Sequence, residues 1–328
     1  MGPADARLAR LVEPVLEGLA RMRTILEAQI AESSRAVSDM TDHVGRFRGK
    51  QLRGALVLLA GDATGNATDE HPAIAAIVEM IHLATLVHDD VLDGAKVRRR
   101  VACVNERWDN QTAVLLGDFL YARAFGLSTD LSSRLASRVL SDATRRICVG
   151  EIEQAALRYD FEMPQETYER IAGAKTAVLY GAACELGARY PGGRDEAGAL
   201  LSQFGNSIGL AFQIIDDCLD LVGEEEVVGK SVGNDIEDGK ITLPVLHVYE
   251  HTDEATRARM RDVYTGVGVE KRLSKLRAVV ELRPGIEFAL ARAQALVREA
   301  QARIQTLPPS TSREALCALG DYVLERSW

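Results

Sequence analysis

Two short acidic clusters hold the residues best suited to chemistry. The pattern DDxxD occurs at Asp89, Asp90 and Asp93, and again at Asp216, Asp217 and Asp220. On an α-helix, positions i and i+4 lie on one face about a turn apart, with i+1 beside them. Each motif is therefore expected to present three carboxylates together, which is costly beside an apolar wall unless a cation neutralises them. Carboxylate ligands that leave room for water and phosphate suit Mg²⁺.

A single DDxxD motif is more often an acidic helix end that faces solvent. Here each copy follows an apolar stretch, HLATLV before the first and GLAFQII before the second, and basic residues follow both copies. The duplication favours a metal site over a solvated surface.

Basic residues accompany both motifs. They are Arg98 and Arg99 after the first motif, Lys230 and Lys240 after the second, Lys50 and Arg53 upstream, and Lys175 beside Thr176 in AGAKTAVLYG. Lys50 and Arg53 are three residues apart and are expected on one helical face. Metal ions combined with bidentate Arg and point-charge Lys donors are what a diphosphate requires. Each cation alone is more often a solvated side chain, and Lys175, among apolar neighbours, fits that explanation least well.

His82 has two interpretations. It is either a further anion contact or, with Glu79, a Glu-x-x-His motif like those of di-iron helical bundles. The second interpretation requires another such motif, and none of the other histidines has an acidic residue three positions before it. The di-iron alternative is therefore weak.

The surrounding sequence predicts an all-α fold. No proline lies between Pro72 and Pro164, and the apolar residues of AIAAIVEMIHLATLVHDD largely follow helical i, i+3, i+4 spacing. Alternating strand patterns between Asn-Gly or Asp-Gly turns are essentially absent. Loops are expected at 61–72, 127–133, 190–198, 223–235 and 307–314. Thr311 and Glu314 have the capping-box spacing that starts a final helix. We expect one domain over residues 1–328, with roughly ten helices.

Composition excludes several classes of function. The chain of 328 residues is 47% hydrophobic and 27% charged, as is ordinary for a globular protein, and its net charge of -9 provides no general attraction for nucleic acid. No window approaches the ~18 uncharged apolar residues of a membrane span, and the N-terminus lacks a signal-peptide core. Five cysteines without a CxxC pair indicate reduced thiols and a cytoplasmic location.

Taken in order, the motifs resemble those of the trans-isoprenyl diphosphate synthases, the polyprenyl synthetase family. RGKQLRG resembles the family's GGKxxRP, and HLATLVHDDVLDGAKVRR resembles its first aspartate-rich motif with the trailing arginine pair. GDFLYARAF, GEIEQ, KTA, FQIIDDCLD and VGKSVGNDIEDGKITLP resemble the remaining blocks. The resemblance implies an all-α isoprenoid synthase helical bundle with a deep central cavity, usually a homodimer, in which the two acidic helices face each other.

The resemblance also implies a reaction and residue roles. The reaction is the head-to-tail (1'-4) condensation of isopentenyl diphosphate onto an allylic diphosphate, by ionisation, attack of the isopentenyl double bond and loss of a proton. The implied Mg²⁺ ligands, for three ions per active site, are Asp89, Asp90, Asp93, Asp216, Asp217 and Asp220. Arg98, Lys175, Lys230 and Lys240 would bind the allylic diphosphate, with Thr176 and Gln213 lining its site. Lys50, Arg53, His82 and Arg99 would bind isopentenyl diphosphate. Asp89, Asp90, Lys175 and Asp216 would be catalytic.

The sequence departs from the family pattern in three places. Gly94 follows the first motif where Glu is common, Arg100 follows the arginine pair where Gly is common, and RGKQLRG lacks a proline and one glycine. None of these changes removes an expected metal ligand or a matched cation.

Product length is expected to depend on the residues just before the first motif. Ala84 and Thr85 lie one helical turn before Asp89 and are small, and Ile81 belongs to the next turn. Small residues there would leave a tunnel open, closed further down by bulky groups such as Phe119 and Phe125. We expect a product longer than C15, in the range C30–C40. Alternatively, Ala84 only allows close helix packing.

Other functions remain open within this fold. The chain could be a shorter-chain farnesyl or geranylgeranyl synthase, or the catalytic subunit of a heteromeric synthase. A terpene cyclase would normally have one DDxxD and no isopentenyl site, and a regulatory subunit should have eroded aspartates. All six aspartates are present, which favours a catalytic chain.

Overall fold

The computed structural model describes residues 3–31, 34–47, 49–98, 101–222, 232–269 and 271–325. Its α-helices are α1 (Pro3–Leu11), α2 (Leu16–Ile30), α3 (Arg35–Val44), α4 (Leu52–Ala63), α5 (His71–Leu92), α6 (Val104–Arg107), α7 (Asn110–Thr129), α8 (Leu135–Ala156), α9 (Gln165–Ala172), α10 (Val178–Arg189), α11 (Asp195–Val222), α13 (Asn234–Glu237), α14 (Leu243–Glu250), α15 (Glu254–Thr265), α16 (Arg272–Val279), α17 (Arg283–Ile304) and α18 (Thr311–Leu324). Two 3₁₀ turns, η1 (Glu13–Val15) and η2 (Gly45–Phe47), and a π-helical segment, η3 (Gly173–Ala177), complete the helical structure of these ranges.

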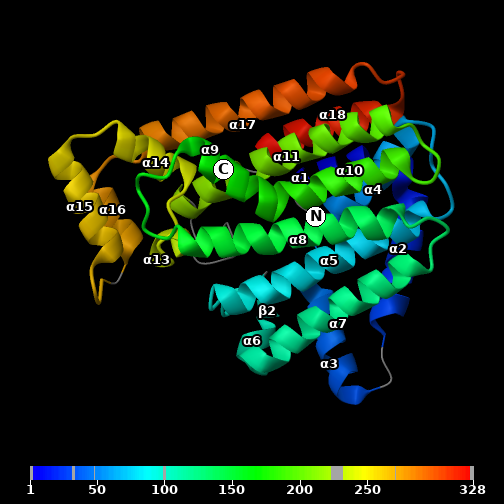
Figure 1. The fold of residues 1–328 in the computed structure, drawn as a ribbon, viewed down its shortest axis with the longest axis horizontal. Helices are drawn as coiled ribbons and strands as arrows, with labels where there is room; N and C mark the ends of the chain where they lie inside the picture. Colours follow the sequence, from blue (N-terminus) through cyan, green and yellow to red (C-terminus); the bar gives the residue numbers. More distant parts are fainter. Residues whose placement is uncertain are drawn as a thin grey trace.

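The long helices run side by side along the longest axis of the molecule (Figure 1). Helix α11 packs against α10 and α17, and α10 in turn packs against α4. Helix α5 packs against α7, α2 and α4. Helices α13 to α16 gather at one end, on the left in Figure 1. Helix α10 also contacts α5, so the helices that carry the two aspartate motifs belong to one bundle and share a neighbour.

Helix α5 shows why the first motif lies where it does. Pro72 occupies its first turn, where a missing backbone N–H costs nothing, and apolar residues are buried along its length. The helix ends at Leu92, and Gly94 follows with a φ of +58°. That left-handed conformation favours glycine, which gives a physical reason for Gly94 where the family commonly has Glu.

The structure confirms the all-α fold and corrects several local predictions. Ten helices of twelve residues or more lie in the described ranges. A short antiparallel hairpin, β1 (Val97–Arg98) with β2 (Val101–Ala102), was not expected. The final helix is capped by Ser310, whose side chain accepts a hydrogen bond from the Arg313 amide, and not by Thr311. Among the described residues, no helix has the length and apolar character needed to cross a membrane.

Candidate active site

Both aspartate motifs lie at the C-terminal ends of long helices. Asp89 and Asp90 belong to the last turn of α5, and Asp216, Asp217 and Asp220 belong to the last two turns of α11. A helix C-terminus carries partial negative charge, which disfavours carboxylates there. Both motifs are therefore placed where a cation would stabilise them.

The first motif divides its carboxylates between the interior and the site. Asp90 is fully buried, and its Oδ1 accepts a hydrogen bond of 2.7 Å from Nε of Arg98 and forms an ion pair with Nη2 of the same residue, also at 2.7 Å. Asp89 is half-buried, and burial followed by repulsion from Glu151 raises its pKa to about 7. A carboxyl group so easily protonated at neutral pH is one that a nearby cation would stabilise in its ionised form.

The hairpin after α5 explains how Arg98 reaches Asp90. The amide of Asn105 donates to the carbonyls of Asp90 at 3.4 Å and Ala95 at 3.0 Å, and so ties the two ends of the turn together. Cys103 lies beside Asp90, and burial together with that charge raises the pKa of its thiol to about 12. Arg98 thus faces back toward the motif; Arg99 and Arg100 lie outside the described residues.

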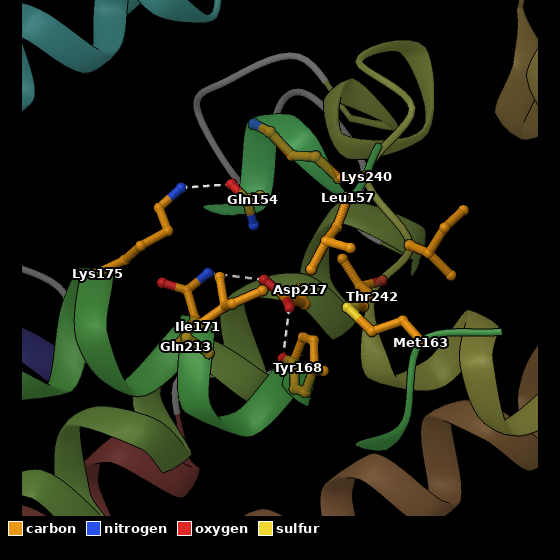
Figure 2. Close-up of a pocket in the computed structure, with 12 residues that line it drawn as sticks. Gln154, Leu157, Met163, Tyr168, Ile171, Lys175, Gln213, Asp217, Lys240 and Thr242 are labelled. Carbon is orange, nitrogen blue, oxygen red and sulfur yellow. Dashed lines mark hydrogen bonds between the residues drawn. The ribbon is translucent and has the colours of Figure 1, made fainter. Parts of the chain in front are cut away.

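The second motif is anchored by two donors. Asp217 is buried, and its oxygens accept hydrogen bonds from Tyr168 Oη at 2.6 Å and from Gln213 Nε2 at 2.7 Å (Figure 2). Burial and the nearby Asp235 raise its pKa to about 8, although both hydrogen bonds oppose that shift. The backbone amide of Asp235 donates to Oδ2 of the buried Asp220 at 3.1 Å.

Lys240 links the first motif to the segment that follows the second motif. Its Nζ lies 3.0 Å from Asp93 of the first motif, and 3.6 Å from Asp235 and 3.1 Å from Asp238 beyond the second. Burial alone would lower the pKa of Lys240, but the three carboxylates raise it above its ordinary value. Lys230, predicted as a partner in phosphate binding, lies outside the described residues.

Lys175 and Thr176 lie on η3, so this stretch is a π-helix and not a continuous α-helix. Lys175 Nζ lies 2.9 Å from Glu151 Oε1 and 2.5 Å from Gln154 Oε1. Thr176 donates to Gln213 at 2.7 Å, and Gln213 donates onward to Asp217. Since π-helical turns frequently occur at functional sites, the segment is well suited to a binding role.

These residues surround a pocket of about 40 Å³. Its polar side consists of Lys175, Gln213, Asp217 and Lys240, and its remaining wall is largely apolar, formed by Leu157, Met163, Tyr168, Ile171, Ala172 and Ile241 with Gln154 and Thr242. Figure 2 shows the polar groups around one opening, with Tyr168 below Asp217. Four predicted side chains, two of them on α11, one on η3 and one between α13 and α14, thus meet at one site.

Lys50 and Arg53, two residues expected to bind isopentenyl diphosphate, have different surroundings. Lys50 precedes α4 because Gln51 has a left-handed φ of +51°, so the prediction that Lys50 shares a helical face with Arg53 is wrong. Lys50 donates to Tyr322 Oη at 2.5 Å, whereas Arg53 lies 4.3 Å above the ring of Tyr180. Among the described residues, no group pairs with the buried Nε of Arg53.

His82 is half-buried on α5, one turn from Glu79. Glu79 Oε1 accepts a hydrogen bond of 2.8 Å from the backbone amide of Gly54 and so ties α5 to α4. This role gives Glu79 a structural purpose without a di-iron site.

The product-length residues differ in exposure. Ala84 and Ile81 are fully buried, whereas Thr85 is half-buried and its hydroxyl donates to the His82 carbonyl at 2.7 Å. On α7, burial raises the pKa of the Tyr121 phenol, and the nearby charge of Asp89 adds to the shift. The ring of Tyr121 stacks on that of Phe125, with the ring centroids 6.4 Å apart. Tyr121, Phe119 and Phe125 are all partly buried against the hydrophobic core.

The residues of the two motifs fit a magnesium site. Asp90 Oδ2 is buried and has no hydrogen-bond partner among the described residues, and two other carboxyl groups have raised pKa values. No preformed group of three His, Cys, Asp or Glu ligands occurs in the described ranges. Mg²⁺ suits such a site, since it binds through one or two carboxylates with water and substrate phosphates.

Sequence reasoning missed five residues that the structure brings to the site. They are Tyr121, Glu151, Gln154, Tyr168 and Asp235. Glu151 and Gln154 are three residues apart in GEIEQ, a spacing that places both on one helical face beside the site. Tyr168 has no local signal, because its partner Asp217 is 49 positions away.

Comparisons with known proteins agree with this geometry. The polyprenyl synthetase family matches residues 34–282. The short chain isoprenyl diphosphate synthase of Methanothermobacter thermautotrophicus is 35% identical, over 95% of this chain and 98% of that protein. The all-trans-nonaprenyl-diphosphate synthase of Rhodobacter capsulatus is also 35% identical, over 96% and 97%. The crystal structure of a polyprenyl synthase from Caulobacter crescentus, complexed with calcium and isoprenyl diphosphate, has a TM-score of 0.92 at 32% identity, over 97% of each chain. With the motifs, the fold and these matches in agreement, the chain belongs to the polyprenyl synthetase family.

Proposed function

We propose that this chain, acting as one domain over residues 1–328, is an all-trans polyprenyl diphosphate synthase. It would join isopentenyl diphosphate head to tail to an allylic diphosphate in a Mg²⁺-dependent reaction. The observation that carries the proposal is the contact of Lys240 with Asp93 of the first motif, because Lys240 also lines the pocket that holds Asp217 of the second motif. Metal-binding carboxylates and phosphate-binding cations are then available at one point, as a diphosphate leaving group requires.

The allylic diphosphate would bind at the mouth of the pocket. Lys175 and Lys240 supply positive charge there, and Thr176 and Gln213 supply polar contacts. The apolar side chains of the pocket, such as Leu157 and Ile171, would limit the access of water. Because the negative charge grows on the diphosphate as it departs, cations fixed beforehand stabilise the transition state more than the substrate.

The six aspartates would have unequal roles. Asp89, Asp93 and Asp216 are the residues that we expect to face Mg²⁺ directly, because none of them is fully buried. Asp90, Asp217 and Asp220 are buried and hydrogen-bonded, and they would hold the shape and the charge of each motif. The second oxygen of Asp90, which has no partner among the described residues, would also be available to the metal. Mg²⁺, three ions per site by resemblance to the family, would neutralise the leaving diphosphate when bound.

Isopentenyl diphosphate would bind near Arg53. Its guanidinium is buried with an unsatisfied Nε, so an anion there would relieve a polar group that costs free energy. Lys50 is exposed and could turn from Tyr322 to a phosphate. His82 and Arg99 complete the proposed set. The proton lost in the last step would pass from the isopentenyl unit to an oxygen of the released diphosphate.

We infer a product longer than C15. Relatives at the same 35% identity include a short-chain and a nonaprenyl synthase, so overall likeness does not set the length. The inference rests on Thr85, a small side chain that is half-buried one turn before Asp89.

A cytoplasmic homodimer is the proposed assembly. All five cysteines are free, which suits a reducing compartment. Exposed apolar side chains on α7 (Val114 and Leu115) and α8 (Val149 and Ile152) could be covered by a second copy. Light scattering of the purified protein tests this, and a monomer would contradict it.

The function is tested by incubating the purified protein with isopentenyl diphosphate, Mg²⁺ and one of three primers, namely dimethylallyl, geranyl or farnesyl diphosphate. The products are then dephosphorylated and separated by chromatography. We expect elongation with at least one primer, to chains longer than C15. No elongation with any primer would refute the proposal for the chain on its own.

A further inference from the structure

One short segment of α8 surrounds a single side chain, Lys175. Glu151 and Gln154 both contact its ammonium group, at 2.9 Å and 2.5 Å. Gly150 contributes by being small, since a Cβ there would lie 3.0 Å from Lys175 Cγ and 3.0 Å from Ala174 Cβ. We call Gly150, Glu151 and Gln154 the cradle.

The cradle meets Lys175 at a special point of the backbone. Lys175 is in the middle of the π-helical segment η3, which packs directly against α8. A π-helical turn displaces the side chains that follow it relative to a regular α-helix. The absence of a side chain at Gly150 then lets the stem of Lys175 pass close over α8 toward the two acceptors.

We propose that the cradle positions Lys175 for the allylic diphosphate, with Glu151 and Gln154 acting on the substrate only through that lysine. The inference rests on the proposed function, because it assigns a purpose to a lysine of that site. A free lysine side chain loses considerable rotamer entropy when it is fixed. Glu151 and Gln154 would restrict the rotamers of Lys175 before the substrate binds, so that less entropy is lost on binding.

A competing explanation is that Glu151 acts through the first aspartate motif. Its charge, after burial, is the main influence that raises the pKa of Asp89. Under that explanation, Glu151 would affect Mg²⁺ binding independently of Lys175. The two explanations are distinguished by substituting Glu151 both in the wild-type protein and in a variant that lacks the Lys175 side chain.

The central experiment is a double-mutant cycle with Glu151→Gln and Lys175→Ala. Glu151→Gln keeps the shape of the side chain and should lower kcat/KM for the allylic diphosphate by about tenfold or more, as loss of an orienting partner typically does. The KM for isopentenyl diphosphate should stay unchanged. In the Lys175→Ala background, Glu151→Gln should have no further effect. A full additional loss in that background would overturn the proposal.

Glu153→Gln is the matched control on the same helix. Glu153 pairs with Arg170, so the variant removes one carboxylate and one ion pair of α8 without touching the cradle. Its kcat/KM should remain within about twofold of wild type, in line with the small contribution of exposed ion pairs. Gly150→Ala keeps every contacting group but crowds the stem of Lys175, and it should raise the KM for the allylic substrate.

A second measurement does not depend on turnover. Lysine labelling of the ligand-free protein, followed by mass spectrometry, reports the accessibility of Lys175. Labelling of Lys175 should increase severalfold in Glu151→Gln and stay at the wild-type level in Glu153→Gln. Unchanged labelling in Glu151→Gln would overturn the cradle even if the enzyme is active. If wild type elongates no primer but the labelling changes as expected, the proposed function fails while the positioning of Lys175 stands.

Discussion

Lys240 donates a hydrogen bond of 3.0 Å to Asp93, across 147 positions of sequence. The lysine follows the second aspartate motif and the aspartate ends the first. Lys240 also lies near Asp235 and Asp238, so one cation is shared by three carboxylates from two parts of the chain. This contact holds the end of the first motif against the segment that follows the second motif.

Removing that cation should cost both stability and activity. Lys240→Ala leaves three carboxylates without their shared partner, which should destabilise the protein by about 1–3 kcal/mol. It should also lower kcat/KM by more than tenfold, since Lys240 is proposed to bind the diphosphate. Thermal unfolding and steady-state kinetics measure the two effects. Wild-type values in both assays would contradict the linking role of Lys240.

The two neighbouring aspartates of the first motif should behave differently. Asp89→Asn should abolish most activity, with little loss of stability, because Asp89 is half-buried and its ionisation is already disfavoured. Asp90→Asn should lose activity and also stability, because it breaks the buried contact with Arg98. Kinetics and denaturant unfolding of both variants test this. Activity of Asp89→Asn within tenfold of wild type, about 1.4 kcal/mol of barrier, would exclude its metal role.

Substitution of Thr85 should change product length with less effect on stability than substitution of Ala84. Thr85→Phe adds bulk at a half-buried position one turn before Asp89 and should shorten the products without a large change in Tm. Ala84→Phe should also shorten them, but Ala84 is fully buried, so overpacking should destabilise the protein by roughly 1–3 kcal/mol. Chromatography of the products and thermal unfolding distinguish the two. An unchanged product profile in both variants would rule out this wall as the limit.

Without metal, the protein should become less stable as pH rises, because two of its carboxyl groups have raised pKa values in the folded state. Asp89 and Asp217 have folded-state pKa values of about 7 and about 8, whereas in the unfolded chain an aspartate has a pKa of about 4. Between these values the folded state binds more protons than the unfolded state, so the free energy of unfolding falls with increasing pH. Mg²⁺ binds the ionised carboxylates and should therefore raise Tm more at pH 8 than at pH 6.

This dependence can be measured by thermal unfolding in EDTA and in Mg²⁺ from pH 5 to pH 9. Asp217→Asn provides the comparison, because an amide does not titrate. The difference in stability between wild type and Asp217→Asn should become less favourable to wild type as pH increases without metal. A difference that does not change with pH would show that Asp217 is not protonated in the folded state.

The sequence by itself determined the fold class and most of the chemistry. Apolar residues at helical spacing, few prolines and two DDxxD motifs were enough to predict an all-α fold and a site for metal and diphosphate, since these signals act over one or two helical turns. Glu151 and Gln154 could also have been found, because they are three residues apart in a matched motif. The local signals for Lys50 were misleading, because the left-handed Gln51 separates it from α4.

Only the tertiary structure decided which groups share the site and which are anchors. Asp90 and Asp89 are adjacent in sequence, yet one is buried against Arg98 and the other faces Glu151 and Lys175. Asp217 acquires its raised pKa from burial and from Asp235. Such burial and pairing depend on helices that pack together from distant parts of the chain. The spacing of residues within one helix fixes which side chains share a face, but only packing fixes what that face meets.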